Sequence, residues 1–247
     1  MSRKNVLVTG ASRGIGRAIA LELGAQGWKV AVHYSVNAPE AEKVQEALND
    51  SCLGVFRADL SDPRNASDLW AEVSDRCEID ALVNNAGIYV PCSFLEQDDE
   101  TFDATWSKTL AINLESPMRL MRAAAFSFKT QGGGKILNIA SRVGFRGEPG
   151  ASHYAASKAA LINLTRSLSI ELAPHKIGVF GVAPGWVDTA MARDGMESRL
   201  ADIISTIPLG RMASPEDCAA VSAFLLSDAA SYLAGQTIDI NGASYFH

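Results

Sequence analysis

VLVTGASRGIG is the sequence of residues 6–16, and RAIALELGAQ follows it at residues 17–26. The first stretch opens with an apolar run that predicts a buried strand and continues into a Gly-rich turn. The second carries apolar residues at helical spacing, so a helix is expected there. Glycines between a strand and a helix allow a tight turn and a close approach to a pyrophosphate, whose charge the helix N-terminus favours. Because Gly-rich turns also occur in ordinary loops, the motif alone indicates a dinucleotide site without establishing it.

Short apolar runs recur along the chain and alternate with longer stretches of helical character, which is typical of strands and helices around a parallel sheet. Seven strands are expected, at Val6–Thr9, Lys29–His33, Leu53–Arg57, Ala81–Asn84, Ile136–Ala140, Ile177–Ala183 and Thr237–Ile240. Helices are expected over Gly14–Gln26, Pro39–Leu48, Pro63–Ser74, about Thr101–Phe128, His153–Ala173 and Pro215–Leu226. No linker, repeat or change of composition divides the chain. A single domain over residues 1–247 is therefore predicted, with a mobile flap over a site at about 190–212.

The composition is that of a globular protein of 247 residues, 47% of them hydrophobic, with a net charge of −6. An acidic chain has no general attraction to phosphate backbones, so a nucleic-acid-binding function is disfavoured. No segment approaches the roughly 18 apolar residues of a membrane span, and the start lacks the pattern of a signal peptide, so we expect a cytoplasmic protein that does not bind membranes. The four cysteines and four histidines are scattered without metal-ligand spacing, and no catalytic metal is expected.

The turn after the second predicted strand reads Ser35-Val36-Asn37 and contains no carboxylate. An acidic side chain at this place accepts hydrogen bonds from an adenosine ribose and repels a 2′-phosphate. Arg13, in the Gly-rich loop, offers a guanidinium that can meet a phosphate. These two features predict NADP(H) as the cofactor, while the alternative for Arg13 is a solvated loop charge.

Tyr154 and Lys158 lie in the sequence YAASK at residues 154–158, within a predicted helix, so they project from the same face. A phenol with an ordinary pKa near 10 is a poor acid–base catalyst at neutral pH. A neighbouring ammonium and a positively charged nicotinamide would lower the pKa of Tyr154 by favouring its ionised form. The alternative is an aromatic residue packed in a helix beside a surface lysine.

TGASRGIG at 9–16, NNAG at 84–87, Asn113, Ser141 and YAASK at 154–158 follow one another in an order and spacing that resemble the short-chain dehydrogenase/reductase (SDR) family. Among its members the sequence is most similar to the 3-oxoacyl-[acyl-carrier-protein] reductases. The resemblance continues through PGWVDT at 184–189 and SDAASYLAGQTIDINGA at 227–243. It implies a single-domain α/β fold of Rossmann type, a doubly wound parallel sheet of seven strands with helices on both faces. The alternation of apolar runs predicts the same fold independently.

The resemblance implies a catalytic set of four residues, Asn113, Ser141, Tyr154 and Lys158. Tyr154 would be the general acid in reduction and the general base in oxidation, and Ser141 would orient and polarise the substrate carbonyl. Lys158 would hydrogen-bond the nicotinamide ribose and lower the pKa of the tyrosine. Asn113 would hold a water molecule in the proton relay. The hydride would come from the nicotinamide ring.

The resemblance also implies residues that contact NADP(H), namely Gly10, Ser12, Arg13, Gly14, Ile15, Gly16, Ser35, Asn37, Asp59, Leu60, Asn85, Ala86, Gly87, Tyr154, Lys158, Pro184, Gly185, Val187 and Thr189. Asp59 and Leu60 would contact the adenine, and Val187 and Thr189 the nicotinamide carboxamide. For two positions a structural role is the alternative. Asp59 would cap the segment that follows it, and Asn84, beside this set, would brace neighbouring strands.

Two departures concern the partners of the chain. The ending NGA at 241–243 replaces the Asp-Gly-Gly of many relatives, and we expect it to tune a C-terminal interface. The 3-oxoacyl-[acyl-carrier-protein] reductases use arginines beside the active-site entrance to meet the acidic carrier protein. The corresponding stretches here, 130–134 and 169–171, lack an arginine. Acyl carrier protein is thus a partner that the resemblance offers and these stretches disfavour, whereas the resemblance implies a homotetramer.

These observations favour an NADPH-dependent carbonyl reductase acting on a ketone, foremost a 3-oxoacyl thioester, with Tyr154 as proton donor. The first alternative is an SDR enzyme for another alcohol or ketone, such as a sugar, polyol, steroid or small aromatic ketone. Phe94, Phe145, His153 and Trp186 would then line an apolar pocket with the flap. The second alternative, from another class, is a binding protein that senses a dinucleotide without catalysis. The complete catalytic set argues against it.

Overall fold

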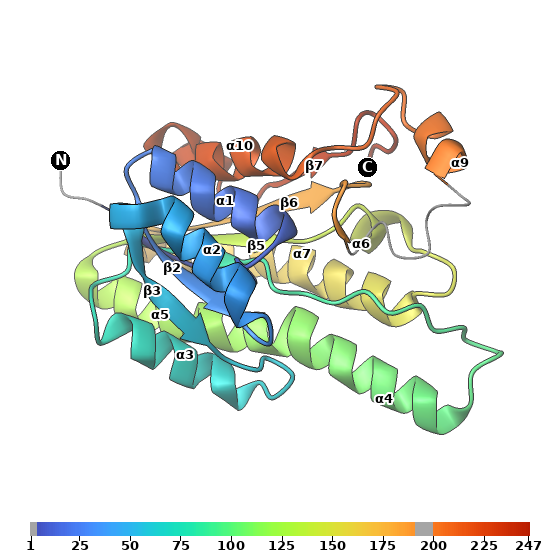
Figure 1. The fold of residues 1–247 in the computed structure, drawn as a ribbon, viewed down its shortest axis with the longest axis horizontal. Coiled ribbons are helices and arrows are strands. Elements are labelled where there is room, and N and C mark those ends of the chain that lie inside the picture. The colour runs from blue at the N-terminus through green and yellow to red at the C-terminus, as the bar shows by residue number, and fades with distance from the viewer. Residues whose placement is uncertain (1–3, 191–199) are drawn as a thin grey trace.

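Seven parallel strands form one sheet in the computed structural model, which describes residues 4–190 and 200–247. The strands are β1 (Asn5–Val8), β2 (Lys29–Tyr34), β3 (Cys52–Arg57), β4 (Ala81–Asn84), β5 (Gly134–Ile139), β6 (Ile177–Pro184) and β7 (Thr237–Ile240). All seven predicted strands are found, with ends that differ from the prediction by two residues or fewer. The strand order is β3-β2-β1-β4-β5-β6-β7 (Figure 1). The predicted doubly wound fold is therefore confirmed.

Helices cover both faces of the sheet (Figure 1). The helices α1 (Gly14–Ala25), α2 (Ala38–Leu48) and α10 (Pro215–Leu226) lie on one face, and α3 (Arg64–Ser74), α5 (Ser116–Gln131) and α7 (Ser152–Leu172) lie on the other. The remaining helical segments are α4 (Asp99–Leu110), η2 (Ala111–Glu115), α6 (Val143–Arg146), α9 (Leu200–Ser205), and the short turns η1 (Asn49–Ser51), η3 (Ala173–His175) and η5 (Asp228–Leu233). Among the described helices, none is long and apolar enough to cross a bilayer.

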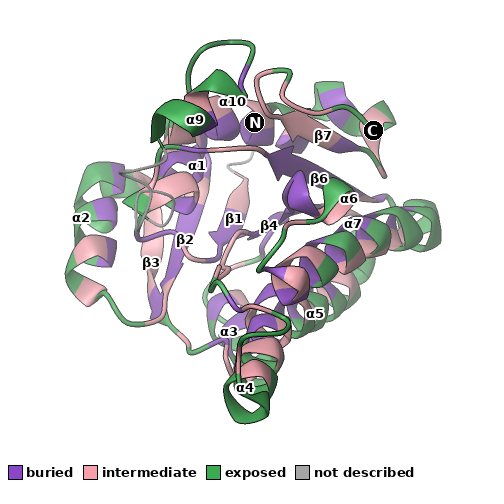
Figure 2. Cartoon of the chain, turned by 90° about the vertical axis from the view of Figure 1, so that its right-hand side faces the viewer, coloured by how far each residue is buried: buried purple, intermediate pink, exposed green. Residues whose placement is uncertain are grey.

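The strands supply both hydrophobic cores because their side chains point alternately to the two faces. In β1, Val6 and Val8 join the core beneath α1, α2 and α10, while Leu7 joins the core beneath α3, α5 and α7. A strand buried on both faces reads as a continuous apolar run, which is why β1 was recognisable from sequence. Figure 2 shows the same pattern, with buried residues along the sheet and exposed ones on the outer sides of the helices.

The segment predicted as one long helix at about 101–128 consists of three parts. Helix α4 begins after Asp98, whose Oδ1 atom accepts a hydrogen bond from the Thr101 amide at 2.8 Å. The π-helical segment η2 separates α4 from α5. A π segment widens the helix by one residue per turn and is often found at functional sites. Here it contains Asn113, a residue of the predicted catalytic set.

The predicted flap at about 190–212 lies partly outside the described residues, since 191–199 belong to the part of the chain that is not described. Beyond it, Ile203 of α9 and Ile207 are buried in a small cluster with Trp186 and Met212. The single sheet runs through strands from Asn5 to Ile240. We propose that residues 1–247 form one domain around it.

The packing of α5 gives a direct test of the core. Phe128 has no exposed surface and meets Trp70 edge-on, with ring centroids 5.7 Å apart. We expect Phe128→Ala to lower the free energy of unfolding by about 3–5 kcal/mol, because it leaves a cavity that neighbouring side chains cannot fill. Urea denaturation followed by circular dichroism measures this.

The control is Leu95→Ala, since Leu95 is 92% exposed. This control should lower the free energy of unfolding by no more than about 1 kcal/mol. Equal destabilisation by the two variants would contradict the assignment of Phe128 to the core.

Candidate active site

The chain reverses its direction of winding between β1 and β4, and hydrogen bonds join the loops that leave these two strands. The Thr9 Oγ1 atom accepts the amide hydrogens of Asn85 at 2.9 Å and of Ala86 at 3.0 Å. The Asn85 side-chain amide donates to the carbonyls of Thr9 at 2.8 Å and of Gly10 at 3.1 Å. In parallel α/β sheets ligands bind at this switch point, beyond the carboxyl ends of the strands. The predicted Gly-rich turn and NNAG motif therefore meet where a ligand is expected.

The glycines of the turn are required by the space around them. A Cβ atom on Gly16 would lie 2.3 Å from the Asn85 Nδ2 atom and 2.3 Å from the Gly10 carbonyl oxygen. Gly10 has a φ of +62° and Gly14 a φ of +55°, in the left-handed region that favours glycine. A Cβ atom on Gly14 would also lie 3.4 Å from a methyl carbon of Thr189. The structure thus brings Thr189 beside the Gly-rich turn.

The N-terminus of α1 is built to receive an anion. Arg13 precedes the helix without a side-chain capping hydrogen bond, and the first turn contains no acidic residue. The amide groups of a first helical turn have no partner within the helix, and the helix dipole makes this end positive. The pyrophosphate of a dinucleotide therefore fits the turn that holds Ser12, Arg13, Gly14, Ile15 and Gly16.

His33 fixes the Gly-rich turn from the side of β2, a role that sequence reasoning missed. Its buried ring accepts the Gly10 amide hydrogen at Nδ1, at 3.0 Å, and its Nε2 atom lies 3.1 Å from the Ala58 carbonyl oxygen. The Nδ1 atom must be unprotonated to accept, so Nε2 carries the hydrogen and donates to Ala58. Burial lowers the pKa of His33 from 6.5 to about 4. No sequence signal reveals this, because both partners are distant in the chain.

The predicted adenosine contacts lie at the ends of β2 and β3, and several have partners of their own. The Asn37 side-chain oxygen accepts the Glu40 amide hydrogen at 3.3 Å and caps α2. The Asp59 carboxylate accepts the Ser61 amide hydrogen at 3.0 Å, which lowers the pKa of Asp59. Ser35 follows β2 directly, and Leu60 is buried beside Asp59. Asp59 thus holds the turn that follows β3 and does not cap α3, which begins after Pro63, and its exposed carboxylate is ionised at neutral pH.

Asn113 is held by the loop after β4. Its side-chain oxygen accepts the Ile88 amide hydrogen at 2.8 Å, and its side-chain nitrogen donates to the Ile88 carbonyl at 2.9 Å. The same nitrogen lies 3.3 Å from the Ser157 hydroxyl, which donates to the Tyr154 carbonyl at 2.7 Å. Through Ser157, the π segment is tied to the helix that carries Tyr154.

The Ser141 hydroxyl interacts with the phenol of Tyr154 and lowers its pKa. Burial raises the pKa of Tyr154 to about 12, and the hydrogen bond with Ser141 offsets part of this rise. The Ser141 hydroxyl oxygen also accepts the Val143 amide hydrogen at 3.2 Å, which fixes its position at the start of α6. The ring of Tyr89 meets that of Tyr154 edge-on, with centroids 5.1 Å apart.

Lys158 is buried one helical turn beyond Tyr154. Its Nζ atom donates to the Ile139 carbonyl at 2.8 Å, and burial lowers the pKa of Lys158 to about 8. A Cβ atom on Gly87 would lie 3.6 Å from this Nζ atom and 3.2 Å from the Asn113 side-chain oxygen. Lys158 of α7 and Asn113 of η2 thus meet beside Gly87, while Tyr154 lies one helical turn before Lys158 and Ser141 follows β5.

In the chain without a bound cofactor, the pKa of Tyr154 is not lowered as expected. The Lys158 Nζ atom lies 5.8 Å from the centroid of the Tyr154 ring and is turned to a backbone carbonyl. Burial of the phenol dominates and moves its pKa upward instead. The tyrosine of the chain alone is therefore a neutral acid at pH 7.

The residues after β6 close the site from the other side. Gly185 donates its amide hydrogen to the Ile240 carbonyl at 2.9 Å, and a Cβ atom there would lie 2.9 Å from that of Asn241. Val187 is buried and pairs with Ala213 in a short parallel bridge. The segment from Pro184 therefore turns away from β7 and returns, through Thr189, to the Gly-rich turn.

The residues expected to line an apolar substrate pocket each have contacts of their own. Phe94 stacks edge-on with Phe102 of α4, and Phe145 stacks on His247. His153 is buried, and its Nε2 atom lies 2.8 Å from the Val90 carbonyl oxygen. Of the four, Trp186 alone borders one of the two hollows described below.

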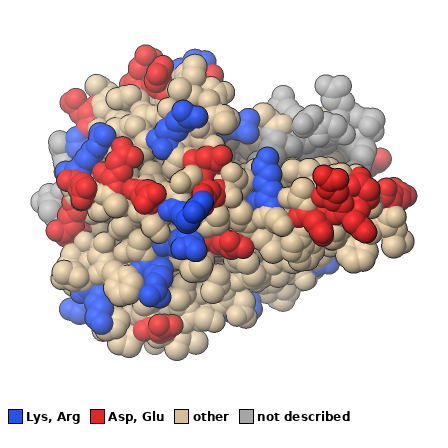
Figure 3. Space-filling model, turned by 90° about the horizontal axis from the view of Figure 1, so that it is seen from below, with Lys and Arg blue, Asp and Glu red and all other residues tan. Residues whose placement is uncertain are grey.

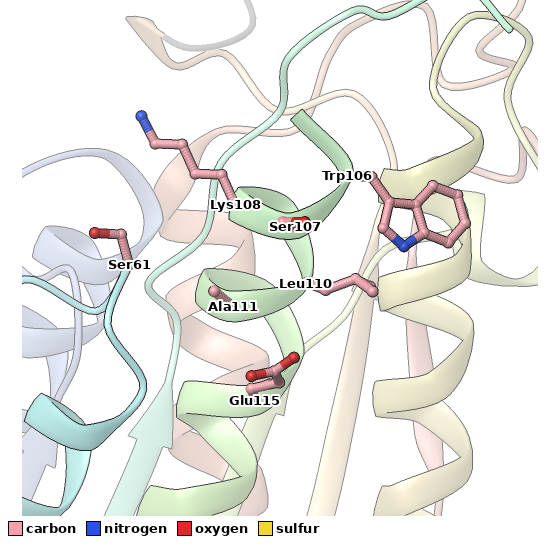
Figure 4. Close-up of a pocket in the computed structure, with 7 residues that line it drawn as sticks. All are labelled: Ser61, Trp106, Ser107, Lys108, Leu110, Ala111 and Glu115. Atoms are coloured by element: carbon pink, nitrogen blue, oxygen red, sulfur yellow. The ribbon is translucent and has the colours of Figure 1, made fainter. Parts of the chain in front are cut away.

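Two hollows in the described part of the chain bear on where a substrate binds. A hollow of about 640 Å³ lies against α4 and is lined by Ser61, Trp106, Ser107, Lys108, Leu110, Ala111 and Glu115 (Figure 4). It contains none of the predicted catalytic residues. A smaller one of about 190 Å³ is lined by Arg142, Arg146, Glu148, Trp186, Asp202, Ile203, Thr206 and Ser244. Within residues 4–190 and 200–247, no three His, Cys, Asp or Glu side chains are placed to hold a metal ion.

The buried His33 predicts a pH dependence of stability. Its pKa is about 4 in the folded chain and 6.5 when free, so below pH 6.5 the unfolded chain binds a proton that the folded chain excludes. The contribution of the neutral His33 to the free energy of unfolding is fully present above pH 6.5 and is lost as the pH falls toward 4. Compared with His33→Asn, we expect wild type to lose about 3 kcal/mol more over this range. Urea unfolding at a series of pH values measures the difference, and parallel curves for the two proteins would exclude a neutral buried His33.

The chain is similar to known proteins over nearly its whole length. The family model described as enoyl-(acyl carrier protein) reductase, a model of the SDR family, matches residues 10–243. The 3-oxoacyl-[acyl-carrier-protein] reductase FabG of Staphylococcus aureus is 38% identical over 246 residues, 98% of each chain. FabG of Escherichia coli is 37% identical over 243 residues, 98% of this chain and 97% of its own.

A solved structure from Beutenbergia cavernae, of a protein proposed to be an NAD(P)-dependent gluconate 5-dehydrogenase with bound NADP, superposes with a TM-score of 0.91. It is 35% identical, and the match covers 98% of this chain and 96% of that one. The resemblance predicted from the sequence motifs is confirmed by these matches. The chain belongs to the short-chain dehydrogenase/reductase family.

Proposed function

We propose that the protein is an NADPH-dependent carbonyl reductase that reduces the ketone of a 3-oxoacyl thioester to an alcohol. The observation that carries this proposal is the meeting of Lys158 and Asn113 beside Gly87, with Tyr154 one helical turn from Lys158. The Lys158 ammonium and the Asn113 side-chain oxygen face the space over Gly87, and the Ser141 hydroxyl interacts with that of Tyr154 and favours its ionised form. The Gly-rich turn, whose glycines leave room for a pyrophosphate, borders the same site.

When bound, NADPH supplies the hydride that adds to the carbonyl carbon. Tyr154 donates its phenolic proton to the carbonyl oxygen, so that the ketone becomes an alcohol and the tyrosine a phenolate. A pKa of about 12 keeps Tyr154 protonated at neutral pH and ready to donate. Ser141, whose oxygen accepts the Val143 amide hydrogen, donates a hydrogen bond to the same carbonyl oxygen and orients it.

Lys158 stabilises the phenolate as it forms. Its pKa of about 8 leaves most of the ammonium protonated at neutral pH, 5.8 Å from the ring that becomes negative. Asn113, fixed on Ile88, holds the water molecule through which a proton returns to Tyr154. Gly10, Ser12, Arg13, Gly14, Ile15 and Gly16 hold the pyrophosphate, and Pro184, Gly185, Val187 and Thr189 border the nicotinamide.

NADP(H) rather than NAD(H) is supported by the turn after β2. Residues 35–37 place no carboxylate where the adenosine ribose is bound, and Arg13 stands at the start of α1. The solved relative from Beutenbergia cavernae binds NADP. Asp59 and Leu60, at the end of β3, are the adenine contacts in this proposal.

The 3-oxoacyl thioester is supported by the names and full-length similarity of the bacterial relatives. A second candidate, an oxidoreductase of a sugar or polyol acid, is favoured by one observation. Arg142 follows Ser141 directly and is only 4% exposed, with a hydrogen bond of 2.7 Å to the Ser244 hydroxyl. Its guanidinium borders the smaller hollow, where it can bind a carboxylate with two parallel hydrogen bonds.

We propose a homotetramer as the working assembly, supported by large apolar side chains on the outer faces of helices. Phe126 on α5, Ile170 on α7 and Phe224 on α10 are exposed in the chain alone. Docking of acyl carrier protein has weaker support. The two stretches expected to carry arginines lack them, and on the face in Figure 3 basic side chains are interspersed with acidic ones.

Tyr154→Phe tests the acid–base role. The variant keeps the ring and loses the proton, so turnover should fall by about 10²- to 10⁴-fold while NADPH binding is retained. NADPH fluorescence titration and the absorbance at 340 nm measure the two quantities. Tyr232→Phe, on a fully exposed tyrosine, is the control and should leave both unchanged. Comparable turnover by Tyr154→Phe would exclude Tyr154 as the proton donor.

The substrate is tested with acetoacetyl thioesters of coenzyme A and of acyl carrier protein. Sugar acids, polyols and unrelated ketones are assayed as alternative substrates, and each reduction is followed with NADPH and with NADH. We expect the thioester on coenzyme A to be reduced fastest, with NADPH preferred. Activity confined to a sugar acid, and lost in Arg142→Met, would establish the second candidate instead. Cofactor binding without turnover on any compound, in both reaction directions, would revive the dinucleotide-sensing alternative.

A further inference from the structure

Arg57 is the last residue of β3, at the edge of the sheet where the Gly-rich turn and the β2–α2 turn lie. Strands β2 and β3 are parallel neighbours, and Arg57 is in register with Tyr34, the last residue of β2. The Ala58 amide donates to the Tyr34 carbonyl at 3.0 Å, so the ends of the two strands remain joined. Arg57 is exposed and therefore stands beside the turn that distinguishes the two dinucleotides.

The Arg57 side chain is turned toward that turn. Its Nε atom donates to the carbonyl of Ser35 at 3.2 Å, and Ser35 is the first residue after β2. A guanidinium has five N–H groups, so the bond to Ser35 leaves four, on the two terminal nitrogens. Within the described part of the chain, no carboxylate lies within 4 Å of them as an ion-pair partner.

The charges around this turn leave Arg57 available to an added anion. The Glu40 carboxylate is paired with Lys43 at 2.6 Å. The Asp59 carboxylate accepts the Ser61 amide hydrogen, and it interacts electrostatically with Arg57 without forming an ion pair. The turn itself offers the Ser35 hydroxyl and no acidic side chain. The Ala11 amide donates to the His33 carbonyl at 2.8 Å, so the loop that carries Arg13 is fastened to the same end of β2.

A planar guanidinium held by one N–H group, with two terminal nitrogens left, is suited to bidentate recognition of a phosphate. An adenosine bound at the end of β2 presents its 2′ position to this turn. We propose that Arg57, together with Ser35 and Arg13, binds the 2′-phosphate of NADP(H) and sets the preference of the protein for this cofactor. The inference rests on the proposed NADPH dependence and names the residue that produces it.

The test compares the binding of adenosine 2′,5′-bisphosphate and 5′-AMP by calorimetry, in wild type and in Arg57→Ala. We expect wild type to bind the bisphosphate more tightly than AMP. Arg57→Ala should lower the affinity for the bisphosphate by about 10- to 100-fold and change the affinity for AMP by less than about 2-fold. Arg57→Lys should recover part of the loss, because it restores the charge without the fork. Unchanged AMP binding also shows that the variant is folded.

Arg64→Ala is the control, since it removes an arginine from the nearby start of α3 that is already paired with Asp62 at 2.7 Å. It should leave the ratio of the two affinities unchanged. If Arg57→Ala weakens both ligands equally, or neither, Arg57 only braces the Ser35 carbonyl and the inference is overturned. If wild type itself does not distinguish the two ligands, the NADPH preference of the proposed function fails. The two failures are therefore separate.

Discussion

The site depends on the hydrogen bonds between Thr9 and Asn85 at the switch point of the sheet. Parallel strands on either side of this point carry their connections away in opposite directions, and the gap left between the loops is where a ligand enters. One hydroxyl and one amide side chain fix the width of that gap by bonding the backbone of both loops. Gly16 must be a glycine because Asn85 and Gly10 occupy the space of any side chain. The conformation of the Gly-rich turn thus depends on its contacts with the loop after β4 as much as on its own sequence.

A buried polar chain continues from this point to the catalytic helix. The Asn84 side-chain nitrogen donates to the Asn138 side chain on β5 at 2.9 Å, and Asn138 donates to the Thr165 hydroxyl on α7 at 3.0 Å. Asn84 therefore braces neighbouring strands, as one sequence-based alternative predicted. Buried polar groups are costly unless each finds a partner, so such a chain restricts how α7 can lie on the sheet. The position of Tyr154 and Lys158 relative to the nucleotide turn follows from it.

The strands, the helices and the grouping of the site were predictable because they depend on local patterns. Apolar runs such as Val6–Val8 are buried on both faces, and the glycines and the YAASK spacing carry their own geometry. The rest depends on contacts between distant residues. The π segment forms where Asn113 bonds Ile88, and His33 acquires its role from Gly10 and Ala58. The direction of the Tyr154 pKa depends on burial, which spacing does not reveal.

The central claim is that hydride transfer and protonation occur at one site between the Gly-rich turn and α7. Its most direct test is reduction of an acetoacetyl thioester with NADPH deuterated at C4 of the nicotinamide, on either face, followed by NMR of the product. We predict that deuterium from one of the two labelled forms appears on the former carbonyl carbon, while the hydroxyl proton exchanges with water. Product that carries no deuterium from either form would contradict direct hydride transfer at this site.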